Sequence, residues 1–63
     1  MYYNELFSKY GMVTCQVGVN DLGQHVVVSI DDESASVRTL QDNGWQRINI
    51  YHKDGTEEEL YER

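Results

Sequence analysis

The residues of this chain that could do chemistry are few, and they form no recognisable catalytic set. Cys15 is the only cysteine, and it lies in a valine-rich stretch with no basic residue beside it. Because a nucleophilic cysteine needs an exposed and stabilised thiolate, we expect Cys15 to be a small buried hydrophobic residue instead. His25 and His52 have no serine, cysteine or aspartate at a nucleophile spacing. The sequence therefore predicts no catalytic residues.

Ligand-binding motifs are also missing from the sequence. The acidic run at residues 31–33 lacks the alternating oxygen ligands, central glycine and distant glutamate of a calcium loop. One cysteine and two histidines far apart make a poor zinc set. The glycines are scattered and match no phosphate-binding motif. We predict no metal, no cofactor and no enzymatic activity.

A different group of residues has the types that are enriched at protein interfaces, namely tryptophan, tyrosine, arginine and large aliphatics. The strand registers proposed below place this group on one face of a sheet, where a partner would contact it. The predicted partner-binding residues are Trp45, Tyr51, Arg47, Leu40, Arg38 and Tyr61.

Composition limits what the chain can be. Its 63 residues make one small domain, residues 1–63, with 11 acidic and 5 basic side chains and a net charge of −6. A domain of this size has a marginal core, and since no internal disulfide can form, self-association is the expected source of extra stability. The negative charge repels phosphate backbones, so nucleic acid is an unfavourable partner. With no membrane-length apolar run and no signal-peptide pattern at the N-terminus, we expect a soluble cytoplasmic protein.

The elements that position these residues begin with a helix. Tyr3, Leu6, Phe7 and Tyr10 recur at helical spacing, and Gly11 follows where a left-handed residue ends many helices. Four polar clusters then divide the chain at intervals of roughly 11 residues, a spacing typical of short antiparallel strands. The sequence predicts a short N-terminal helix followed by a five-stranded meander.

The strand registers are predicted by matching apolar residues across the turns. In the first hairpin, Val19 opposite Gln24 across a four-residue loop gives uniformly apolar pairs. Ile30 opposite Ala35 continues the same face into the third strand. The pairs predicted in these two hairpins are Val17 with Val26, Cys15 with Val28, Val13 with Ile30, Val28 with Val37, and Val26 with Thr39.

The third hairpin contains Asn43-Gly44, the strongest dipeptide signal for a two-residue turn. With Asp42 opposite Trp45, this turn places Val37 opposite Ile50. It also places Thr39 opposite Ile48, on the face that already collects the valines.

The last hairpin has two candidate registers. A two-residue turn at residues 54–55 would place Ile50 opposite Glu59. A three-residue loop at residues 53–55 instead places Leu60 opposite Ile48 and Glu58 opposite Ile50, and we favour it because it puts Leu60 on the apolar face.

One sheet face then collects the apolar residues that the helix would cover, namely Val13, Cys15, Val17, Val26, Val28, Ile30, Val37, Ile48, Ile50 and Leu60. The predicted fold is α+β, with the helix on a meander that is either open or curled towards a barrel. An alternative places a second helix near residues 35–43, which gives the order α-ββ-α-ββ. In a barrel, some residues of the predicted binding face would be core.

The best functional hypothesis is a non-catalytic interaction protein that forms a homodimer and binds a protein partner through its aromatic and arginine residues. An alternative is an inhibitor from a mobile element whose acidic residues, including Glu57, Glu58 and Glu59, mimic a nucleic-acid backbone. A platform that stacks single-stranded nucleic acid is less favoured. The simpler interpretation of the glutamates is a charged edge strand that resists aggregation.

Overall fold

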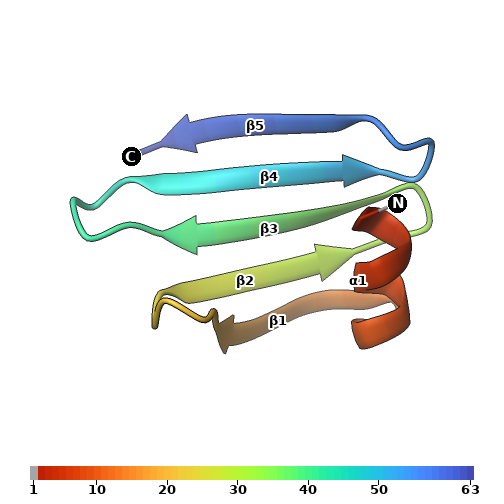
Figure 1. Cartoon of the computed structure of the whole chain (residues 1–63), viewed down its shortest axis with the longest axis horizontal. Helices are drawn as coiled ribbons and strands as arrows, with labels where there is room; N and C mark the ends of the chain where they lie inside the picture. Colours follow the sequence, from red (N-terminus) through yellow and green to blue (C-terminus); the bar gives the residue numbers. More distant parts are fainter. Residues whose placement is uncertain (1) are drawn as a thin grey trace.

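The computed structural model describes residues 2–63 and arranges them as one helix packed on a five-stranded antiparallel sheet (Figure 1). The strand order in the sheet is the order in the chain, so β1 and β5 form the two edges. The predicted α+β meander is confirmed. Its elements are α1 (Tyr2–Tyr10), β1 (Val13–Val19), β2 (His25–Ile30), β3 (Ser34–Leu40), β4 (Gln46–His52) and β5 (Glu57–Glu62).

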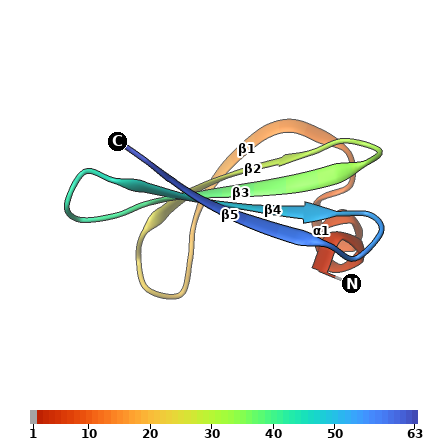
Figure 2. The same cartoon turned by 90° about the horizontal axis from the view of Figure 1, so that it is seen from above.

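The sheet is open and strongly twisted, and it does not close into a barrel. Figure 2 shows α1 against one end of the sheet, so much of the sheet on this side is not covered by the helix. The alternative second helix near residues 35–43 is also wrong, because β3 and its following turn occupy these positions. Val37 and Thr39 are β-branched and alternate along the chain, which suits a strand. With Leu40 they would make only a thin apolar stripe on a helix.

Helix α1 forms where its apolar spacing predicts. Tyr3 and Leu6 are buried, whereas Phe7 is half-exposed and stacks on the Tyr3 ring at a centroid distance of 5.9 Å. Gly11 ends the helix with a φ of 68°, and its N–H donates to the carbonyl of Phe7 at 2.7 Å. This is the left-handed terminating geometry that glycine adopts without strain.

The core lies between α1 and the middle of the sheet. Tyr3 and Leu6 pack on Val28, Ile30 and Ala35. The hydroxyl of Tyr3 donates a hydrogen bond of 2.7 Å to the carbonyl of Asp31, which ties the helix to the turn between β2 and β3. Among residues 2–63 only six hydrophobic residues are buried, which is the small core that the chain length implies.

Three of the hairpin loops share one length and one geometry. Each has three residues and ends in a glycine with positive φ: 79° at Gly23, 86° at Gly44 and 96° at Gly55. This is the loop predicted for residues 53–55, and that prediction is confirmed. The N–H to carbonyl bonds that close the loops join Asn20 to Gln24 at 3.0 Å, Gln41 to Trp45 at 2.8 Å and His52 to Thr56 at 2.8 Å.

The first hairpin departs from its predicted register by one residue over most of its length. Gln24 pairs across from Asn20, because Asn20 also caps the loop by accepting the N–H of Gln24 on its side-chain oxygen at 2.9 Å. Val17 therefore lies opposite Val27, and not opposite Val26. A β-bulge between Val13 and Gln16 absorbs the shift, and the predicted pairing of Val13 with Ile30 is confirmed.

Beyond the bulge, Cys15 does not face Val28 as predicted, because Gln16 takes that position. The second hairpin, by contrast, has the predicted pairs, with Val28 opposite Val37 and Ile30 opposite Ala35.

The largest difference from the predicted registers lies in the third hairpin. Its loop has three residues where two were predicted, so Val37 lies opposite Asn49 and Thr39 lies opposite Arg47. The predicted partners, Ile50 and Ile48, are each displaced by one position. Because side chains alternate between the faces of a strand, a shift of one residue turns the whole of β4 over.

Strand β5 turns over together with β4. Its register is the predicted one, with Leu60 opposite Ile48 and Glu58 opposite Ile50. These residues nevertheless point away from α1. We call the side that bears the helix the helix side and the opposite side the outer face. Of the ten residues predicted to face the helix, the helix side keeps Val13, Val26, Val28, Ile30 and Val37.

Candidate interaction surfaces

The outer face of the sheet lies opposite α1 and carries seven aliphatic side chains among polar ones. One cross-strand row runs through its centre, from Val17 to Val27, Arg38, Ile48 and Leu60. The ends of this row are the most accessible, with Val17 66% and Leu60 49% exposed, whereas Ile48 between Arg38 and Leu60 is only 6% exposed. The aliphatic residues of the outer face are Val17, Val19, Val27, Leu40, Ile48, Ile50 and Leu60.

The basic residue at the centre of this face is neutralised within the same chain. Arg38 forms an ion pair of 3.0 Å with Glu62 and donates a second hydrogen bond to Gln46. At the rim, His52 lies 3.8 Å from Glu58. Glu58 is exposed here, which removes the difficulty of a glutamate beside Ile50 on a buried face. The outer face thus presents aliphatic side chains around paired polar groups.

The helix side carries most of the predicted aromatic and arginine residues. Arg47 lies opposite Tyr61, and Tyr51 stacks on Tyr2 of α1 with a centroid distance of 4.1 Å. Trp45 closes the adjacent loop, and Arg63 lies 5.5 Å from the centre of its ring. We call Trp45, Arg47, Tyr51 and Tyr61 the aromatic–arginine surface.

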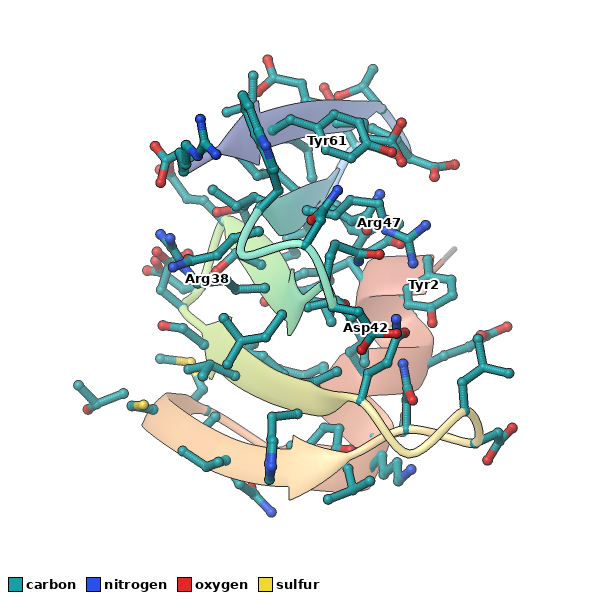
Figure 3. All side chains as sticks on the ribbon, turned by 90° about the vertical axis from the view of Figure 1, so that its left-hand side faces the viewer. Tyr2, Arg38, Asp42, Arg47 and Tyr61 are labelled. Atoms are coloured by element: carbon teal, nitrogen blue, oxygen red, sulfur yellow. The ribbon has the colours of Figure 1, made fainter. Side chains whose placement is uncertain are left out.

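The six predicted partner-binding residues are therefore divided between two faces. Figure 3 shows Arg47 and Tyr61 on the side of Tyr2 and the helix, and Arg38 on the opposite side. Leu40 shares the outer face with Arg38, two positions away on the same strand. The single predicted surface is wrong in this respect, because the longer third loop inverts β4 and β5 relative to β3.

Two buried hydrogen-bond donors lie near the aromatic–arginine surface. Within residues 2–63, Nε of Arg47 and Nε2 of Gln41 have no hydrogen-bond partner. A buried donor without an acceptor costs roughly 1–3 kcal/mol. Burial also raises the pKa of Tyr51, with smaller contributions from Tyr2 and Glu57, so its hydroxyl remains a neutral donor. The two unpaired donors have almost no exposed surface, so a partner cannot reach them in this conformation.

The predicted burial of Cys15 is wrong, since its side chain is exposed at the β1 bulge. His25 is exposed on the outer face. Neither residue is brought together with other groups that could form a nucleophile and base pair. Within residues 2–63 no group of three or more histidine, cysteine, aspartate and glutamate residues could hold a metal ion.

The acidic turns gather at one end of the molecule. The N–H of Lys53 donates to the carbonyl of Glu33 at 2.8 Å, so the β2–β3 and β4–β5 turns lie side by side. The backbone N–H groups of Glu33 and Ser34 donate to the Asp31 carboxylate at 2.9 and 2.8 Å and hold its pKa below the usual value. Hydrogen bonds from Thr56 likewise lower the pKa of Asp54. These two carboxylates therefore cap their turns as stable anions.

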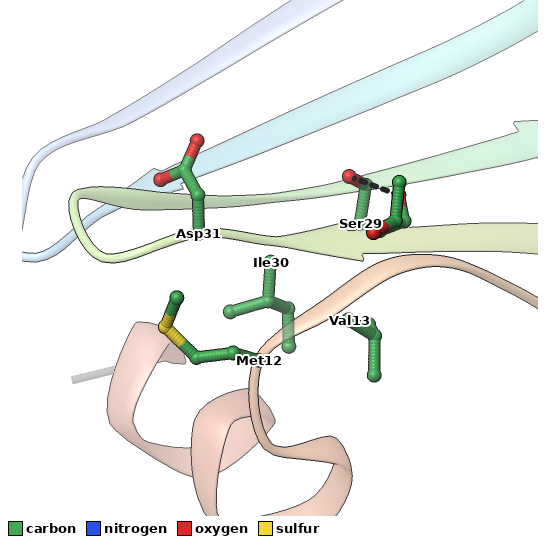
Figure 4. A pocket seen from close by; sticks show the side chains of 6 residues that line it. Met12, Val13, Ser29, Ile30 and Asp31 are labelled. Carbon is green, nitrogen blue, oxygen red and sulfur yellow. Dashed lines mark hydrogen bonds between the residues drawn. The ribbon is translucent and has the colours of Figure 1, made fainter.

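A hollow of about 460 Å³ lies beside the β1 bulge, lined by Met12, Val13, Thr14, Ser29, Ile30 and Asp31. Figure 4 shows that the Asp31 side chain points away from Met12 and Val13. The hydroxyl of Ser29 is already used, since it donates to the carbonyl of Thr14 at 2.8 Å. This lining offers no converging catalytic groups.

Sequence reasoning missed the outer face as an apolar surface, because Val17, Ile48, Ile50 and Leu60 were assigned to the helix side. The sequence nevertheless contains a feature that predicts the correct faces, namely the glycines of the turns. Three of the four hairpin loops end in glycine, and three-residue loops at all three would have placed these residues correctly.

Comparisons with known proteins give no further information on this chain, because no protein-family model, curated protein or solved structure matches it. No helix within residues 2–63 is long and apolar enough to span a membrane.

Proposed function

We propose that this protein is a small, acidic, non-catalytic interaction protein that self-associates and binds a protein partner. The observation that carries the proposal is the aliphatic outer face, where Val17, Leu40 and Leu60 are each more than 40% exposed, at 66%, 41% and 49%. These residues share one face of the sheet, and exposed apolar faces are typical of protein contact surfaces.

The aromatic–arginine surface is the proposed site for the protein partner. Tyrosine, tryptophan and arginine contribute most of the binding energy at many interfaces. Tyr61 is 58% and Trp45 37% exposed, so both rings can be covered by another chain. Arg47 as a whole is half-buried, and a guanidinium can donate hydrogen bonds to a carboxylate of that chain.

A capture experiment tests the partner site. The tagged wild-type protein is used to isolate partners from a native lysate, alongside Arg47→Ala and Tyr61→Ala, with Leu22→Ala as a matched control at an 82% exposed loop position. We expect a specific partner with the wild type and the control, and at least tenfold less of it with both site variants. Equal recovery with all four proteins would remove the aromatic–arginine surface from the proposal.

Mimicry of nucleic acid is the second candidate, supported by the clustering of acidic turns at one end of the molecule. The bond between Lys53 and Glu33 brings residues 31–33 next to Asp54, close to the start of β5. Such an anionic end could occupy a basic groove. Changing Glu57, Glu58 and Glu59 to glutamine should then weaken capture of a basic nucleic-acid-binding protein, most strongly at low salt. Unchanged capture at both low and high salt would exclude mimicry.

A further inference from the structure

We infer that a second copy of this chain covers the outer face, in a two-fold symmetric sandwich of two sheets with both helices on the outside. The inference rests on the proposed self-association and assigns it a surface and a symmetry. Sheets that pack face to face lie about 10 Å apart and bury the side chains between them. A two-fold axis brings the same patch of both copies together, so the patch must be compatible with itself.

The low charge of the outer face is compatible with contact between two copies of the chain. Within the strands this face carries Arg38, Glu58 and Glu62, a formal charge of −1. The rest of the chain has four basic and nine acidic side chains and carries −5 of the total of −6. The strands of the helix side carry the same formal charge, from Arg47, Glu57 and Glu59, but α1 already occupies part of that side. Two outer faces can therefore meet with little like-charge repulsion.

The central arginine does not oppose this contact. Arg38 is paired with Glu62 at 3.0 Å inside each copy, and both side chains are partly covered already, at 42% and 55% exposure. A buried charge is tolerated when it is paired and hydrogen-bonded. Packing the centres of the two faces together would therefore bury the Arg38–Glu62 ion pairs, whereas the remaining charge of the face, on Glu58, lies at the rim beside His52.

The two edges of the sheet are poor alternatives for self-association. Strand β5 has glutamate at positions 57, 58, 59 and 62, so pairing it with another β5 would bring like charges together. Strand β1 carries a bulge between Val13 and Gln16, which disrupts the regular edge that an added strand needs. Charge and bulge thus leave the face as the available surface.

The area of the outer face is large enough for a small, stable interface. Strands of six or seven residues, spaced about 4.8 Å apart with a rise of about 3.3 Å per residue, give a face of roughly 20 by 20 Å. Two such faces with their side-chain relief bury about the 1,000 Å² that a specific interface requires. A consequence is that the two aromatic–arginine surfaces lie on opposite outer sides of the dimer, which makes it bivalent for the partner.

The test compares Leu60→Lys with Leu22→Lys by sedimentation equilibrium over a range of protein concentrations. Both variants change the net charge equally, but Leu60 is on the outer face and Leu22 is in the first loop, 82% exposed. We expect a dimer for the wild type and Leu22→Lys, and a dissociation constant at least tenfold higher for Leu60→Lys. Circular dichroism checks that each variant is folded, and Val17→Lys repeats the test from the other edge of the face.

An isotope-filtered NOE measurement on wild-type protein mixed from labelled and unlabelled chains covers the case in which both variants unfold. Contacts between copies should join methyl groups of Val17, Val27, Ile48 and Leu60. A monomer at tens of micromolar, or a dimer with contacts elsewhere, would overturn the inference. Neither result tests the partner site, which the Arg47 and Tyr61 variants test separately.

Discussion

At the scale of single residues, the hydroxyl of Tyr3 links the helix to the sheet through its 2.7 Å bond to the carbonyl of Asp31. Tyr3→Phe keeps the buried ring but leaves that carbonyl without its donor. We expect a loss of about 1 kcal/mol in the free energy of unfolding, measured by urea denaturation. Tyr61→Phe, at a 58% exposed ring, is the control and should have no effect. Equal stability of the two variants would show that the hydrogen bond contributes nothing.

The carboxylate of Asp31 gives the stability of the protein an acid dependence. Because backbone N–H groups lower its pKa in the folded state, the ionised form is favoured by folding. The contribution is complete above the unfolded pKa of about 3.9 and is lost as the pH falls through the lower folded value. We expect Asp31→Asn to be less stable than wild type at pH 7, measured by urea denaturation. Below about pH 4 the two proteins should converge.

The control for this pH experiment is Asp32→Asn, in the same turn. Among residues 2–63 the Asp32 side chain accepts no backbone hydrogen bond, whereas Asp31 accepts two. If the asparagine at position 32 reproduced the effect at position 31, the cause would be the general negative charge of the turn and not the hydrogen-bonded carboxylate.

At the scale of elements, the glycines that end the hairpin loops fix the strand registers. Gly44 has a φ of 86°, where an L-residue with a Cβ is strained. We expect Gly44→Ala to lower the free energy of unfolding by roughly 1–2 kcal/mol in urea denaturation. Gly18→Ala is the matched control, because Gly18 lies in β1 and an added Cβ would meet only Val26 Cγ2, at 4.0 Å. That variant should be as stable as wild type, or slightly more stable.

The same loops explain how far the sequence predicted the fold. Apolar spacing and turn residues predicted helix α1, all five strands, the register of the β2–β3 hairpin and the β4–β5 loop. The faces of β4 and β5 did not, because Asn43-Gly44 suits both a two-residue and a three-residue loop. The apolar pattern of β4 did not decide between them, since Ile48 and Ile50 make a plausible core on either side.

At the scale of the whole molecule, the small core and the open outer face bear on the proposed association. If the second copy covers the outer face, folding and dimerisation are linked by mass action. We expect the thermal unfolding midpoint of the wild type to rise with protein concentration, measured by calorimetry from about 10 to 500 μM. Leu60→Lys should remove this dependence. A midpoint independent of concentration in the wild type would show that the folded monomer is stable by itself.

For the candidate surfaces as well, residue types were read from the sequence, whereas the face on which each residue lies depended on the strand register. Residue types alone identified Trp45, Arg47, Tyr51 and Tyr61. Arg47 lies opposite Tyr61, whereas Trp45 and Tyr51 lie towards opposite ends of β4, beside Arg63 and Tyr2. Arg38 and Leu40 were grouped with them only because the register of the third hairpin was wrong by one residue. In the structure these two residues belong to the outer face, so one predicted surface became two.

The sequence by itself determined the N-terminal helix, the antiparallel hairpins and the positions of the turns, because helical and strand periodicities and turn residues are local properties. It also determined the acidic charge and the absence of a recognisable catalytic motif. It left residues 35–43 open between strand and helix, and the structure shows a strand at Ser34–Leu40. Only the tertiary structure decided which residues face the helix and which face outwards. The physical reason is that strand side chains alternate with a period of two, so one additional loop residue at the β3–β4 turn moved Ile48, Ile50 and Leu60 from the helix side of the sheet to its outer face.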